Sequence, residues 1–258
     1  MGFFVQSRAL RALILACGIA SVGTASSLRA ETPVLSATQA IGKSAEPFGL
    51  FASSLSSGGL REKWLGVQRR LEDELVQLAL CEGDRDGCAS PAALQFLDIV
   101  DAAKARGGRA RLGEINRAVN LAIRPVSDLA QYGQIDVWTS PLATLARGAG
   151  DCEDYAIAKF VALRHAGVAP HDLRIVIMHD ALRGEDHAVV AARLDGSWLM
   201  LDNRRMAMVE DVYPGNYRPI FLIDAEGVKS YRDAIPLGED QQVASMLTPQ
   251  STTETAPM

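Results

Sequence analysis

The sequence lacks the local signatures of several common enzyme classes. Its 258 residues contain no glycine-rich phosphate-binding loop, no HExxH pair of a zinc peptidase and no GxSxG nucleophile elbow. It has no basic cluster that could follow a phosphate backbone, and 31 Asp and Glu outnumber 26 Lys and Arg. The sequence therefore does not predict a phosphate-loop nucleotide-binding protein, an HExxH zinc peptidase or a GxSxG hydrolase. It does not predict a nucleic-acid-binding protein either.

Long apolar runs are also missing. The longest near the start, at 12–22, follows two arginines and precedes small residues. This is the pattern of a secretory signal, and the run is too short for a membrane-spanning helix of about 20 residues. We predict that residues 1–30 are a signal peptide cleaved after Ala30, with Ser27 as an acceptable alternative, and that the protein is exported to the periplasm. A lipoprotein acylation site at Cys17 would leave almost no hydrophobic region before the cysteine.

Cysteine is scarce, with three residues left after the signal peptide. Cys81 and Cys88 bracket the turn-rich loop 82–87, which is short enough to be closed by a disulfide in an oxidising compartment. Cys152 is then an odd thiol in an exported chain. Chemical reactivity is the usual reason for such a thiol.

Composition and periodicity divide the remaining chain into three parts. Residues 31–59 are rich in small polar residues and predict a loosely ordered lead-in, 60–235 predict a single domain, and 236–258 predict a disordered tail. Helices are expected over 60–78, 91–100, 115–123, 141–147 and 152–166, and strands over 173–178, 187–194, 197–201 and 220–223. The fold class is α+β, with helices first and an antiparallel sheet behind them.

The sequence Gly-Asp-Cys-Glu-Asp-Tyr-Ala at 150–156 puts Cys152 at the junction between a glycine and a helix. A helix start has unpaired N–H groups and a positive dipole end, which favour a thiolate and can hold an oxyanion. Cys152 is therefore a candidate nucleophile.

A two-residue turn at 195–196, Asp-Gly, supplies a geometric test. In a regular hairpin around it, Val189 faces Asp202, so His187 and Asp202 are diagonal neighbours on one face of the sheet. Their Cα atoms would lie roughly 7–8 Å apart, a gap that two polar side chains can bridge. We predict that Cys152 attacks a carbonyl, His187 transfers the proton and Asp202 orients the imidazole, giving acyl transfer through a thioester.

Plainer explanations exist for each of these residues. A lone cysteine in a helix is often a small buried hydrophobe. His179, beside Asp180 at a strand end, is a rival base. Asp202 is also explained as a carboxylate that caps the turn at Asn203.

Three carboxylates surround the candidate nucleophile: Asp151, Glu153 and Asp154. Their negative charge would raise the pKa of the thiol unless it is neutralised. A calcium ion, which takes several oxygen ligands, would neutralise it. Acidic residues in the first turn of a helix are also favourable without a metal, and the residues alone leave both explanations open.

Several segments together resemble the bacterial transglutaminase-like cysteine peptidases. They are 150–156, the Asp-His-Ala-Val of 186–189 and the Trp-Leu-Met-Leu-Asp-Asn of 198–203, with Asn116, Asn120 and 136–141 upstream. The resemblance covers roughly residues 90–225. It implies a papain-like, transglutaminase-core fold with Cys152, His187 and Asp202 as the triad.

The resemblance is to the LapG-like periplasmic proteases within this family. It implies an endopeptidase that cuts a large surface adhesin and so controls biofilm attachment, with calcium held by Asp151, Glu153 and Asp154. It also implies a partner, the periplasmic domain of an inner-membrane cyclic-di-GMP receptor. Amide transfer to an amine uses the same triad and remains an alternative, as does a transglutaminase-like binding module without activity.

Overall fold

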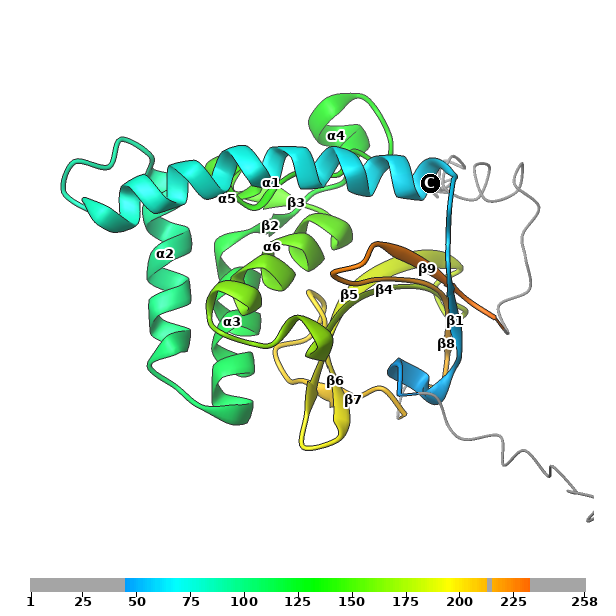
Figure 1. The fold of residues 1–258 in the computed structure, drawn as a ribbon. Helices are drawn as coiled ribbons and strands as arrows, with labels where there is room; N and C mark the ends of the chain where they lie inside the picture. Colours follow the sequence, from blue (N-terminus) through cyan, green and yellow to red (C-terminus); the bar gives the residue numbers. More distant parts are fainter. Residues whose placement is uncertain (1–44, 213–214, 233–258) are drawn as a thin grey trace, which may run out of the picture. The chain divides into compact units, whose positions relative to one another are not determined.

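A computed structural model describes residues 45–212 and 215–232 (Figure 1). The predicted signal peptide and the predicted tail lie outside these residues. The helices are α1 (Gly59–Gly83), α2 (Pro91–Lys104), α3 (Gly108–Ala122), α4 (Asp128–Tyr132), α5 (Pro141–Arg147) and α6 (Cys152–His165), with 3-10 turns at Pro47–Gly49 and Pro170–Asp172. The strands are β1 (Ala52–Ser54), β2 (Arg124–Pro125), β3 (Ala149–Gly150), β4 (Leu173–Asp180), β5 (Glu185–Leu194), β6 (Ser197–Leu201), β7 (Val209–Glu210), β8 (Tyr217–Ile223) and β9 (Val228–Tyr231).

Seven strands form one antiparallel sheet in the order β1-β9-β8-β4-β5-β6-β7. The hairpin of β5 and β6 has the predicted register, because Leu194 pairs with Ser197 and Val190 pairs with Leu201. Its turn residues Asp195 and Gly196 both have positive φ, as a type I′ turn requires. The predicted hairpin is therefore confirmed.

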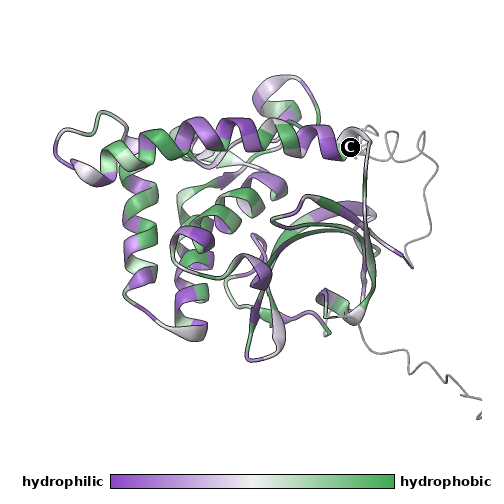
Figure 2. Cartoon of the chain, viewed as in Figure 1, coloured by the Kyte–Doolittle hydropathy of each residue, from purple (hydrophilic) through white to green (hydrophobic). Residues whose placement is uncertain are grey.

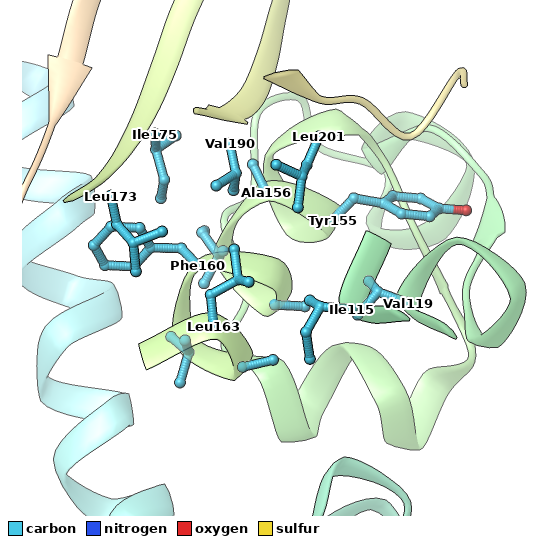
Figure 3. Close-up of a cluster of buried hydrophobic side chains, with 14 of the residues drawn as sticks. Ile115, Val119, Tyr155, Ala156, Phe160, Leu163, Leu173, Ile175, Val190 and Leu201 are labelled. Atoms are coloured by element: carbon cyan, nitrogen blue, oxygen red, sulfur yellow. The ribbon is translucent and has the colours of Figure 1, made fainter. Parts of the chain in front are cut away.

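Helix α6 is the centre of the molecule. It packs on β4 and β5 on one side and contacts α2, α3 and α5 on the other (Figures 1 and 3). Its buried residues Ala156, Phe160 and Leu163 form the expected apolar stripe, and Figure 3 places them between Ile115 of α3 and the strands. The helix that carries the candidate nucleophile is thus held by the main hydrophobic core.

The opposite face of the sheet carries a second apolar cluster, which includes Met178, Trp198 and Tyr231. In Figure 2 the inner strands are coloured mainly as hydrophobic, whereas α1 alternates between hydrophobic and hydrophilic bands. This difference fits a helix with one buried side and strands that are covered on both faces.

The start of the described chain covers that second cluster. Phe48 and Leu50 pack against it, and Ala45 accepts a hydrogen bond of 2.9 Å from the indole nitrogen of Trp198. β1 pairs with β9 through Ala52 and Tyr231. Part of the predicted lead-in therefore has regular structure, because a partner strand far along the chain supplies hydrogen bonds that its composition does not predict.

A disulfide joins Cys81 in the last turn of α1 to Cys88 in the loop before α2, and Cys152 is a free thiol. Among the described residues, no helix combines the length and the apolar character needed to cross a membrane.

Candidate active site

Cys152 is the first residue of α6. The chain reaches it through β3, which pairs in parallel with β2 and so fixes Ala149 and Gly150 against the end of α3. Gly150 is required by space, since a Cβ there would lie 2.8 Å from Cβ of Asp154. The glycine therefore allows the first turn of α6 to fold back closely on the segment before it.

His187 and Asp202 form a buried pair. Nε2 of His187 lies 2.9 Å from Oδ1 of Asp202, and the two residues are 1% and 3% exposed. The same carboxylate oxygen accepts a hydrogen bond of 2.9 Å from the backbone N–H of Arg204. Burial raises the pKa of Asp202, but His187, the N–H of Arg204 and the charge of Lys159 together bring it below its ordinary value.

The sulfur of Cys152 lies against β5 at the residue that follows His187. The backbone N–H of Ala188, the next residue, donates a hydrogen bond to it. Nδ1 of His187 is buried and has no hydrogen-bond partner among the described residues. The imidazole is thus tied through Nε2 to Asp202, and its second nitrogen remains available for proton transfer.

The rival base is differently occupied. Nδ1 of His179 lies 3.0 Å from Oδ1 of Asp186, and its side chain is about one-third exposed at 32%. It pairs with its neighbour on β5 across the β4–β5 ladder. His179 therefore has a local carboxylate partner of its own, separate from Asp202.

Carboxylates around the nucleophile form an acidic cluster. Oxygens of Asp128, Asp151 and Glu153 lie within 4.8 Å of one another. Asp128, on the short α4, was not among the residues identified from the sequence. It lies far from 151–153 in the chain, and only the fold of the loop between α3 and α5 brings it there.

Asp154, the third predicted ligand, has a different environment. Its Oδ1 accepts hydrogen bonds from the backbone N–H and the hydroxyl of Thr139, at 2.9 and 2.6 Å. Its Oδ2 is buried and has no hydrogen-bond partner among the described residues, and the same holds for Oδ1 of Asp128 and Oδ1 of Asp151. Two of these oxygens, those of Asp128 and Asp151, belong to residues of the three-carboxylate cluster, and buried carboxylate oxygens without donors fit the needs of a hard cation.

Burial and the acidic cluster together disfavour the thiolate of Cys152. Burial, followed by the charges of Glu153 and Asp151, raises the pKa of Cys152 well above its ordinary value, although the N–H of Ala188 opposes the shift. The thiol lies 3.2 Å from Oε2 of Glu153 and donates to it. Burial also raises the pKa of Asp128 to about 6 and that of Asp151 further, with Glu153 adding to the latter. Without a cation, the site therefore favours a neutral thiol.

Comparison with known proteins gives a family and a fold. The profile of the bacterial transglutaminase-like cysteine proteinases matches residues 76–223. A structure of LapG from Legionella pneumophila is 24% identical and covers 66% of this chain and 94% of its own, with a TM-score of 0.50. An EGTA-treated form is 22% identical over 66% and 91%, with a TM-score of 0.51. A calcium-bound form is 22% identical over 61% and 90%, with a TM-score of 0.48.

None of the curated proteins compared with the chain matches it. The similarity to the LapG structures establishes the fold. The predicted mixture of helices with an antiparallel sheet, of the transglutaminase-like type, is thereby confirmed.

Proposed function

Since the chain belongs to the bacterial transglutaminase-like cysteine proteinases and is a cysteine protease, we propose that it cleaves an exported protein with Cys152, His187 and Asp202 as its triad. One observation carries the proposal. Asp202 fixes the imidazole of His187 through Nε2 at 2.9 Å, and Nδ1 has no hydrogen-bond partner among the described residues. The next residue on the same strand, Ala188, donates its backbone N–H to the sulfur of Cys152. This is the arrangement that a base needs to serve a neighbouring nucleophile.

The catalytic cycle follows from these groups. Nδ1 of His187 takes the thiol proton, the sulfur attacks the peptide carbonyl, and the C–N bond breaks as the imidazolium gives its proton to the leaving amine. Water then attacks the thioester while His187 accepts its proton, the S–C bond breaks to release the carboxylic acid, and the imidazolium returns the proton to the sulfur of Cys152. The N–H of Cys152 at the start of α6 is suited to stabilise the tetrahedral oxyanion because it has no partner within the helix.

We propose calcium as the cofactor, held by Asp128, Asp151 and Glu153. The buried oxygens of Asp128 and Asp151 that have no donor among the described residues support it, as does the raised pKa of Asp151, which burial and then the charge of Glu153 cause. When bound, the ion would neutralise the cluster and lower the pKa of the neighbouring thiol. Asp154, which accepts hydrogen bonds from Thr139, would help to fix the first turn of α6, where Glu153 lies.

We also propose a periplasmic location and a surface adhesin or another exported protein as the substrate. The signal-like segment at 1–30 supports export. The disulfide between Cys81 and Cys88 is consistent with an oxidising compartment. The inner-membrane cyclic-di-GMP receptor remains a proposed partner that rests on the family resemblance.

The test compares cells that produce the wild-type protein with cells that produce Cys152→Ala. Released and surface-bound proteins are separated, and new N-termini are mapped by mass spectrometry. We expect one exported polypeptide to be cleaved and released only by the wild type. Cleavage at the same bond by Cys152→Ala would refute the triad.

A second assay separates hydrolysis from amide transfer. The purified protein is incubated with a glutamine donor and a labelled amine. Amine incorporation without new N-termini would identify an amide transferase and contradict the protease proposal.

A further inference from the structure

Lys159 is completely buried, with 0% of its surface exposed, on the helix that carries the nucleophile. It lies seven residues after Cys152, which is two helical turns and therefore the same side of α6. An apolar residue could fill the same space without the cost of removing an ammonium group from water. A lysine at this position therefore indicates that its amino group has a polar partner.

Its main contact is the strand end that precedes Asp202. Nζ of Lys159 donates a hydrogen bond of 3.3 Å to the carbonyl oxygen of Leu201, the last residue of β6. It also lies 5.9 Å from the ring centre of Tyr155. Burial lowers the pKa of Lys159 to about 7, and the nearby carboxylate of Asp202 opposes this shift.

Helix α3 holds the other side of the same segment. Nδ2 of Asn120 donates to the backbone oxygens of Asp202 and Arg205, at 3.0 and 3.2 Å. Helices α6 and α3 thus donate hydrogen bonds to the two backbone carbonyls on either side of the α-carbon of Asp202. Its carboxylate is then free to face His187.

We propose that Lys159 is a positioning residue, which ties the Leu201 carbonyl to α6 and so sets the distance between the helix that bears Cys152 and the Asp202 that orients His187. This inference rests on the proposed triad. One helix would then carry both the nucleophile and the anchor of the orienting carboxylate, so that the three groups keep their separation when the sheet flexes.

The test uses the full mature chain in buffer containing calcium. Lys159→Met removes the donor while keeping a similar shape, Lys159→Arg keeps a donor, and Leu163→Ala removes packing from a fully buried site on the same helix. Alkylation of Cys152 by iodoacetamide reports the nucleophile. Proton–nitrogen correlation spectra of ¹⁵N-histidine-labelled protein report the imidazole, and His187→Gln identifies its signals.

We expect Lys159→Met to slow alkylation at least tenfold and to turn the His187 signals from an Nε2-protonated form into an exchanging mixture. Lys159→Arg should recover part of both. Leu163→Ala should lower the thermal midpoint while leaving the imidazole signals unchanged. Wild-type His187 signals and an alkylation rate within twofold of wild type in folded Lys159→Met would overturn the proposal.

A reciprocal measurement does not depend on the folding of a lysine variant. In ¹⁵N-lysine-labelled protein, Asp202→Asn should move the Nζ signal of Lys159, and an unmoved signal also overturns the proposal. Failure of the proposed function is distinguishable, because proteolysis retained in Cys152→Ala would reject the triad while the Lys159 and His187 signals still report their coupling to Asp202.

Discussion

His187 and Asp202, 15 residues apart in the chain, are joined by a buried hydrogen bond of 2.9 Å across the β5–β6 hairpin. Asp202→Asn keeps the shape but removes the negative charge that supports the imidazolium, and its amide NH2 can turn toward the imidazole as a competing donor. We expect kcat to fall by about 10²–10⁴ with a small change in KM, as for other orienting carboxylates. Steady-state kinetics on the identified substrate measure it. A loss of less than about threefold would mean that the pair is structural.

Gly150 gives a test of the junction before the nucleophile. An alanine Cβ would lie 2.8 Å from Asp154, so Gly150→Ala should destabilise the protein by about 1–3 kcal/mol and reduce activity. Gly113→Ala, in α3, is the matched control, because its Cβ would meet only Cε of Met208, at a distance of 3.5 Å. The control should gain about 0.5–1 kcal/mol. Urea denaturation measures both, and equal effects would contradict the close approach at Gly150.

The disulfide between Cys81 and Cys88 should contribute to stability without affecting catalysis. It closes a loop across seven positions, and replacement of both cysteines by serine should lower the free energy of unfolding by about 2–3 kcal/mol. The double variant should keep the wild-type kcat at a temperature where it is folded. A changed kcat in the folded variant would show coupling between this loop and the site.

Calcium removal should destabilise the protein through the acidic cluster. A bound ion at about 100 times its Kd adds about 2.7 kcal/mol, so EGTA should lower Tm and added calcium should restore it. Asp128→Asn should abolish most of this shift, because Asp128 belongs to the three-carboxylate group. Asp86→Asn, in the exposed loop, is the charge-matched control. A calcium response retained in full by Asp128→Asn would remove that residue from the site.

Lys159 should also make stability depend on pH. Its pKa is about 7 in the folded protein and 10.5 ordinarily, so between these values the unfolded chain binds more protons. The free energy of unfolding of the wild type should therefore rise with pH across this window, by up to about 1.4 kcal/mol per unit, and this contribution should be absent in Lys159→Met. Denaturation curves at several pH values measure the difference. Parallel profiles for the two proteins would contradict it.

The candidate site was predictable where local rules decide it. The Asp195-Gly196 turn sets the hairpin register, and that register brings His187 beside Asp202. The glycine before Cys152 and the carboxylates around it indicate a helix start. These signals depend on residues close together in the sequence.

The remainder depends on packing between distant segments. Asp128 joins the acidic cluster only through the path of the chain between α3 and α5. Lys159 has an ordinary helical spacing, and only the position of β6 over α6 makes it a buried donor. β1 and β9 are short strands whose pairing joins the two ends of the described domain, so neither has a strong local pattern.

The central place of α6 has a consequence for mutational scanning. Helix α6 lies in the middle of the core and begins with Cys152, so a small loss of packing around it would displace the sulfur atom. Substitutions at the buried positions in the first two turns of α6, next to Cys152, should therefore score as inactive even where the protein accumulates normally. Amide hydrogen exchange in α6 would distinguish variants in which the helix is displaced from variants that have lost a reacting group.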